Sequence, residues 1–213
     1  FSLEQFWQAG IQYPVINNDN FGILKGAYLI VRRNVEEFPI KSVMSQENND
    51  ALVTIIQEFV QTLPVNFKGD FIQASQEEYQ EVAKQVIEQC KLFYYHKQQD
   101  KDKPLEVEET EAKWQKGAAI FKSHNKRLII LANLEDHFTI IYNFNSDLIT
   151  NAFEDISYLI KSLDKKSSGF VFDNETGYTT IDPHHNGIGV ELTYLLNLQQ
   201  TSTLDSIKNQ LHS

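Results

Sequence analysis

Two short segments rich in β-branched and aromatic residues, close together in the chain, constrain the fold more than any other feature. They cover residues 127–132 and 137–143, and residues 133–136 join them. Segments of this composition form strands, and so short a link connects neighbouring antiparallel strands. The sequence therefore predicts a β-hairpin, although the link lacks the common Asn-Gly turn.

Three amphipathic helices are predicted around this hairpin, because apolar residues recur at intervals of three and four positions. The first follows Ser45 and ends at Pro64, since proline cannot continue a helix. The second begins at Ser75, whose spacing to Glu78 suits a capping box. The third covers residues 146–163. The apolar faces consist of Leu52, Ile55, Ile56, Phe59, Val60 and Leu63; of Tyr79, Val82, Ala83, Val86, Ile87 and Cys90; and of Leu148, Ala152, Phe153, Ile156, Leu159, Ile160 and Leu163.

The remaining segments complete an α+β pattern. Further strands are predicted at residues 26–31, 177–182 and 189–198, and a short closing helix carries Leu204, Ile207 and Leu211. Residues 98–111 are charged without apolar periodicity and predict a surface loop. Hairpins mixed with helices in this order predict an antiparallel β-sheet flanked by α-helices. We expect residues 1–25 to form an extended N-terminal arm and residues 26–213 to form one domain.

Composition excludes several classes of protein. With 41% apolar residues and a net charge of −10, the chain is globular and a nucleic-acid partner is disfavoured. No apolar run is long enough for a membrane helix, so the chain is not expected to span a membrane. The acidic cluster at residues 106–111 is either a solvated face or a dock for a basic protein.

The single cysteine and the first residue bear on the compartment. Cys90 excludes a disulfide within the chain and is expected in the core, with a reactive thiol as the alternative. The chain begins with Phe1 rather than methionine, so either a presequence was removed or the chain was trimmed. A removed presequence favours a mitochondrial location, with a cytoplasmic or cytoskeletal one as the alternative.

Three segments carry groups that could do chemistry. Glu135 and Asp136 precede His137 in the predicted hairpin, where they form either a general base with an orienting partner or a polar turn. Asp182, His184 and His185 lie in a loop rich in proline and glycine, but their spacing matches no known metal motif.

The third segment is Arg32-Arg33, placed just after the first predicted strand. An arginine pair can grip a phosphate through bidentate hydrogen bonds, or it can form surface ion pairs. The sequence alone leaves both readings open.

Taken in chain order, with the arginine pair first, the hairpin second and the loop last, the three segments resemble the catalytic domain of the phosphagen (ATP:guanidino) kinases, such as arginine and creatine kinase. Residues 133–137 resemble the family's Asn-Glu-Glu-Asp-His, and residues 35–39 resemble its Leu-Glu-Gly-Tyr-Pro. Residues 177–198 resemble the family segment that contains Cys-Pro-Thr-Asn-Leu-Gly and a following arginine. The similarity extends over residues 26–198, and it implies transfer of a phosphoryl group from ATP to a guanidinium nitrogen.

The same resemblance implies that much of the nucleotide site is replaced. Glu135 matches a glutamate that binds the guanidinium, and Asp136 and His137 match its neighbours. An arginine of the family falls at Thr139, its reactive cysteine at Asp182, and the arginine after the loop at Glu191. The family's small N-terminal domain and its C-terminal Arg-Gly-x-x-Gly-Glu loop have no counterpart in the sequence.

Three functions follow as expectations. The first is an inactive pseudoenzyme, without cofactor or metal, that acts as a structural subunit of a larger protein complex. It is expected to dock through the aromatic residues of the N-terminal arm, Phe6, Trp7, Tyr13 and Phe21. The alternative is that these aromatic residues pack on their own domain. The second is a residual phosphotransferase that acts on arginine, creatine or a protein arginine. The third is a sensor that keeps Glu135 and Asp182 for binding a cation.

Overall fold

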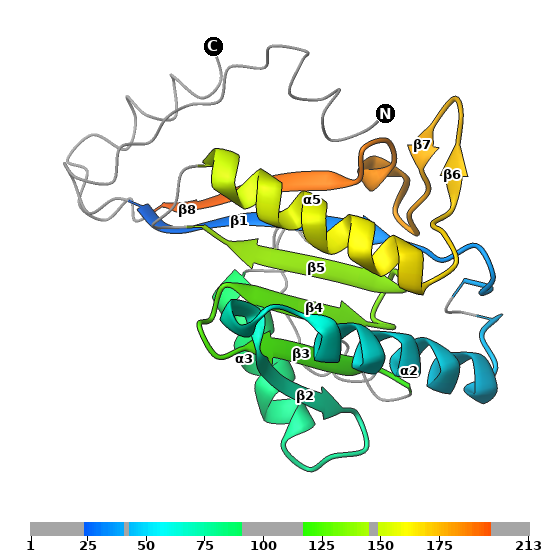
Figure 1. The fold of residues 1–213 in the computed structure, drawn as a ribbon, viewed down its shortest axis with the longest axis horizontal. Helices are drawn as coiled ribbons and strands as arrows, with labels where there is room; N and C mark the ends of the chain where they lie inside the picture. Colours follow the sequence, from blue (N-terminus) through cyan, green and yellow to red (C-terminus); the bar gives the residue numbers. More distant parts are fainter. Residues whose placement is uncertain (1–23, 41–42, 91–116, 145–148, 197–213) are drawn as a thin grey trace, which may run out of the picture.

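The computed structural model describes residues 24–40, 43–90, 117–144 and 149–196. Six strands form one sheet in the order β2-β3-β4-β5-β1-β8, and every neighbouring pair is antiparallel (Figure 1). The strands are β1 (Leu24–Arg33), β2 (Gly69–Gln73), β3 (Ala119–Ser123), β4 (Leu128–Ala132), β5 (Phe138–Asn143) and β8 (Val190–Leu196). Two short strands, β6 (Phe172–Asp173) and β7 (Gly177–Tyr178), form a separate hairpin.

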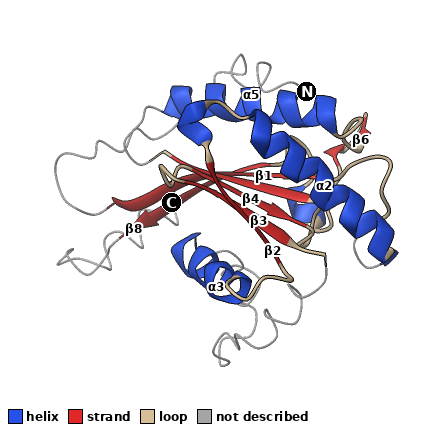
Figure 2. Ribbon diagram, turned by 60° about the horizontal axis from the view of Figure 1, so that its bottom comes forward, coloured by secondary structure: helices blue, strands red, loops and turns tan. Residues whose placement is uncertain are grey.

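Helices cover both faces of the sheet, as Figure 2 shows. On one face, α2 (Gln46–Thr62) and α5 (Ile149–Lys166) pack over the larger apolar core. On the other face, α3 (Tyr79–Cys90) packs over a smaller core that includes Tyr79, Ala83 and Val86. Two 3₁₀ turns, Val65–Phe67 and Pro183–His185, complete the described elements. The α+β fold class predicted from the sequence is confirmed.

The predicted hairpin and the first helix are confirmed closely. Strands β4 and β5 pair antiparallel, with Ala132 opposite Phe138 next to the connecting turn. Helix α2 begins after Ser45, whose hydroxyl oxygen accepts a hydrogen bond from the Asn48 backbone N–H at 3.2 Å. This bond satisfies one of the free N–H groups in the first turn of the helix.

Three predicted boundaries are wrong. Helix α3 begins at Tyr79, four residues after the predicted cap Ser75. A turn closed by Gln76 precedes the helix. The Gln76 side chain accepts a hydrogen bond from the Gln73 N–H, and the Gln76 N–H donates to the Gln73 carbonyl. Helix α5 continues to Lys166 rather than ending at residue 163. The first strand continues to Arg33, so the arginine pair lies within β1 and not after it.

The strand predicted at residues 177–182 is also mostly wrong, since β7 ends at Tyr178. Two backbone N–H groups that follow β7 donate to side chains and not to a neighbouring strand. Thr180 donates to the Asn186 side chain, and Ile181 donates to the Asp136 carboxylate. Strands β2 and β3 were not predicted.

Several predictions fall outside the described residues: the N-terminal arm with its aromatics, the loop at residues 98–111, the closing helix, and Leu148. The side chains of Ile87 and Cys90 are likewise outside the description. No described helix combines the length and the apolar character needed to cross a membrane.

Candidate functional site

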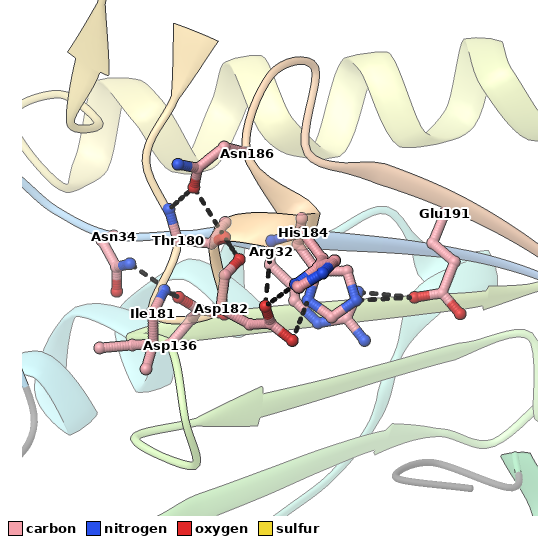
Figure 3. Close-up of polar contacts among 10 residues, drawn as sticks. Arg32, Asn34, Asp136, Thr180, Ile181, Asp182, His184, Asn186 and Glu191 are labelled. Atoms are coloured by element: carbon pink, nitrogen blue, oxygen red, sulfur yellow. Dashed lines mark hydrogen bonds and ion pairs between the residues drawn. The ribbon is translucent and has the colours of Figure 1, made fainter. Parts of the chain in front are cut away.

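The three segments singled out in the sequence meet at one end of the sheet. Asp136, in the turn between β4 and β5, is buried, and one of its carboxylate oxygens accepts two hydrogen bonds (Figure 3). The Asn34 side-chain amide donates at 2.7 Å, and the Ile181 backbone N–H donates at 2.8 Å. Asp136 therefore ties the residue after β1 to the loop after β7, across 102 and 45 positions of sequence.

His137 is held by both ring nitrogens. Its Nδ1 accepts a hydrogen bond from the Val35 backbone N–H at 2.9 Å, so the ring proton is on Nε2, which donates to the Pro39 carbonyl at 2.9 Å. The side chain is 1% exposed, and burial lowers its pKa below the ordinary 6.5. Both ring nitrogens therefore have partners within the protein, and His137 links the turn after β4 to Val35 and Pro39.

Arg32 and Glu191 form an ion pair on the sheet surface. The Arg32 guanidinium lies 2.9 Å from the Glu191 carboxylate, and both side chains are largely shielded from water. Strand register explains the pairing: Glu191 is directly opposite Ile30, which is two residues from Arg32 and therefore on the same face. Thr193 donates a further hydrogen bond to Glu191 at 3.0 Å.

Asp182 and His185 extend this ion pair into a chain of polar contacts. His185 lies between two carboxylates: its Nε2 is 3.6 Å from Glu191, and its Nδ1 is 3.9 Å from Asp182. Burial and the nearby Arg32 lower the His185 pKa. The Asp182 pKa is lowered mainly by a hydrogen bond from the His184 backbone N–H, for which Asp182 serves as the N-cap.

Metal binding gains no support from this loop. Within the described residues, no group of three or more histidine, cysteine, aspartate or glutamate side chains is arranged to hold a metal ion. The His184 side chain is exposed, and its Nδ1 lies 3.0 Å from the carboxylate of Asp182, the N-cap of the same turn.

Arg33 has the opposite environment to Arg32, because successive strand residues point to opposite faces. Its side chain is buried and donates to the backbone carbonyls of Arg32 at 2.7 Å and Ile188 at 3.0 Å. The guanidinium carbon lies 3.7 Å from the centre of the Tyr178 ring, and burial lowers the Arg33 pKa to about 10. Arg33 thus holds the loop before β8 and is not at the surface.

Gly189 permits this close approach. It adopts a φ of +58°, and a Cβ at this position would lie 2.4 Å from the Arg33 guanidinium. Glycine tolerates this backbone conformation at little cost, and it leaves the space that the arginine fills.

Two further positions named from the sequence have clear surroundings. Glu135 is half-buried in the turn between β4 and β5. Thr139 is buried in β5, directly opposite Arg32 of β1. The structure thus brings Arg32, Thr139 and Glu191 together on one face, although what these residues do in the protein stays a prediction.

The sequence assigned no individual role to Asn34, Asn186 and Tyr178, which organise the site. Asn34 uses both ends of its amide, donating to Asp136 and accepting from the His137 backbone N–H at 2.9 Å. Its position immediately after the arginine pair was the available signal, but the contact partners are far away in the sequence. Asn186 accepts from the Thr180 N–H at 2.8 Å and so closes the loop.

Comparison with known proteins agrees with the fold. The family model of the ATP:guanido phosphotransferase C-terminal catalytic domain matches residues 51–213. The chain therefore belongs to this family. A search of curated proteins finds no match.

One similar solved structure is the duplicated taurocyamine kinase from Schistosoma mansoni with bound transition state analog components. It superposes on this chain with a TM-score of 0.70 at 22% sequence identity, and the match covers 94% of this chain and 27% of that one. Its substrate-free form gives a TM-score of 0.66 at 19% identity, covering 87% of this chain and 25% of that one. A lombricine kinase gives 0.68 at 15% identity, covering 88% of this chain and 51% of that one. This chain thus spans about a quarter to a half of these proteins, and the likeness shows the shared fold.

Proposed function

We propose that this chain is a non-catalytic member of the ATP:guanido phosphotransferase family that acts as a structural subunit of a larger protein assembly. The observation that carries the proposal is the ion pair between Arg32 and Glu191 at 2.9 Å. By resemblance, Glu191 stands where the family has an arginine near the ATP phosphates. A carboxylate at this place repels phosphate and also occupies the nearby arginine.

The surroundings of the other candidate groups support the same proposal. Arg33 points into the protein and donates to backbone carbonyls, so its guanidinium is already used. His137 is bonded at both ring nitrogens. Phosphoryl transfer depends on positive charge placed around the phosphates, and these described groups supply little of it.

Magnitudes indicate how large the effect is. A charge-assisted hydrogen bond to phosphate contributes ~1.5–3 kcal/mol. Loss of two such contacts weakens binding by about 3–6 kcal/mol, which corresponds to roughly 10²–10⁴-fold in affinity. A kinase of this family would then hold Mg-ATP too weakly to work at cellular concentrations.

The experiment that tests inactivity measures phosphoryl transfer by the purified chain. The assay supplies Mg-ATP with arginine, creatine, taurocyamine or lombricine, and also runs the reverse direction with the phosphorylated compounds and Mg-ADP. We expect no turnover above a protein-free control. Turnover that disappears in an Arg32→Ala variant would instead support the alternative, a residual guanidino phosphotransferase.

The structural role is tested separately by purification from the native source under mild conditions. We expect the chain to elute with other proteins in a fraction much larger than the monomer mass of 24.6 kDa. Elution as a free monomer without partners would contradict this role. Fractionation of the same material also tests the proposed mitochondrial location.

A further inference from the structure

We propose that one end of the sheet is a docking surface for a basic protein segment that carries apolar side chains. This sheet-end surface consists of the apolar residues Ile40, Phe172 and Ile181 and the acidic residues Glu36, Glu37, Asp173, Glu175 and Asp182. The inference rests on the proposed role as a subunit of an assembly, and it adds the chemistry of the partner.

The two segments that form the sheet-end surface are joined by backbone contacts. Val35 forms a β-bridge with Phe170, and the Glu36 N–H donates to the Gly169 carbonyl at 3.3 Å. The Val171 N–H donates to the Asn34 carbonyl at 2.8 Å. Residues 34–36 and 169–171 therefore lie side by side where β1 ends, and the β6–β7 hairpin projects beyond them (Figure 1).

Three large apolar side chains of the sheet-end surface are exposed. Ile40 is 52% exposed, Phe172 40% and Ile181 42%. They are half of the six strongly exposed large hydrophobic residues in the described part of the chain. Grouped apolar exposure with polar residues around it is typical of surfaces that bind another protein.

The surface is also held in a fixed shape. One carboxylate oxygen of Asp173 accepts from the backbone N–H groups of Glu175 at 2.9 Å and Thr176 at 2.8 Å, which closes the hairpin turn. Phe172 stacks edge-on against Tyr178 with ring centres 5.0 Å apart. The Ile181 backbone is tied to Asp136. Because little conformational freedom remains to be lost, docking onto these residues costs less entropy.

Charge decides which partner suits the surface. Residues 34–40 and 169–185 contain five carboxylates and no lysine or arginine. Hydrogen bonds from the backbone lower the pKa of both Asp173 and Asp182, which keeps them ionised at neutral pH. A second copy of this chain, with its net charge of −10, is repelled, as are nucleic acids and anionic lipids. A positively charged segment is attracted.

The test uses the full chain and a fluorescein-labelled peptide of alternating lysine and leucine, about a dozen residues long, with a glutamate–leucine peptide as the charge control. Fluorescence anisotropy measures affinity at low and at physiological salt. We expect the lysine peptide alone to bind, and Phe172→Ser with Ile181→Ser to weaken it at least about tenfold, since apolar anchors dominate such contacts. Val65→Ser, an exposed apolar residue outside the surface, should change it less than twofold.

A matched pair of charge variants separates local from overall electrostatics. Neutralising Glu36, Glu37 and Glu175 to glutamine should weaken the lysine peptide several-fold. The same change at Glu77, Glu78 and Glu81, all exposed near α3, should have little effect. Equal losses in both triple variants, binding of the glutamate peptide, or absence of any binding would each overturn the docking surface. Any of these results would leave the measurement of phosphoryl transfer and the elution of the chain in a large assembly unchanged, so failure of the docking surface is distinguishable from failure of the proposed function.

Discussion

At the scale of single residues, the adjacent Arg32 and Arg33 have different partners because strand residues alternate between faces. Arg32 pairs with Glu191, which is 159 positions away, while Arg33 is buried against Tyr178 and backbone carbonyls. The sequence left a phosphate grip and surface ion pairs open for both arginines and could not separate their roles. Pairing over such distances depends on strand register, and no local pattern reports it.

Arg33→Lys is predicted to destabilise the fold. Lysine lacks the planar fork that donates to the Arg32 and Ile188 carbonyls while stacking on Tyr178. Leaving a buried carbonyl unsatisfied costs ~1–3 kcal/mol, so we expect a loss of about 2 kcal/mol in the free energy of unfolding, measured with urea. Arg32→Lys, which can keep its ion pair with Glu191, serves as the control and should cost about 1 kcal/mol or less. Equal losses in the two variants would contradict the distinction.

His137 should make stability depend on pH. Burial lowers its pKa below 6.5, so in this window the unfolded chain binds more protons than the folded one. Its contribution is therefore complete above about pH 6.5 and is lost as the pH falls below that value. In His137→Asn, urea unfolding between pH 5 and pH 7.5, roughly the histidine range, should show a weaker pH dependence. His185→Asn is the comparison, because burial also lowers the pKa of His185. An unchanged profile in His137→Asn would contradict the assignment.

At the scale of elements, the sequence predicted the start of a helix correctly where a serine caps that helix. Ser45 caps α2, as predicted, whereas Ser75 lies four residues before the start of α3.

Ser45→Ala should reduce the free energy of unfolding by about 1 kcal/mol, because it removes an N-cap. Ser75→Ala should change it by less than about 0.5 kcal/mol, the usual range for surface substitutions. Chemical denaturation measures both, and a larger loss for Ser75→Ala would contradict the observed helix start.

The sheet was predicted only in part. The β4–β5 hairpin has a strong composition signal, but β2 contains glycine and aspartate and is an edge strand with a half-exposed burial pattern. The candidate site had a similar outcome: its segments were identified, yet the Asn34–Asp136–Ile181 connection follows from tertiary contacts alone.

At the scale of the whole molecule, the fold is that of a phosphotransferase catalytic domain, and we propose that the charges on its site differ from what that chemistry requires. The described site residues form a chain of internal contacts through Asp182, His185, Glu191 and Arg32. Arg32 is thereby paired within the protein. We propose that the fold persists without a working nucleotide site.

Isothermal titration calorimetry of the full chain with Mg-ATP tests this claim most directly. We predict no measurable binding up to millimolar nucleotide, and Glu191→Gln, which removes the competing carboxylate from Arg32, should bind more tightly than the unmodified chain. Micromolar binding of Mg-ATP by the unmodified chain would contradict the account.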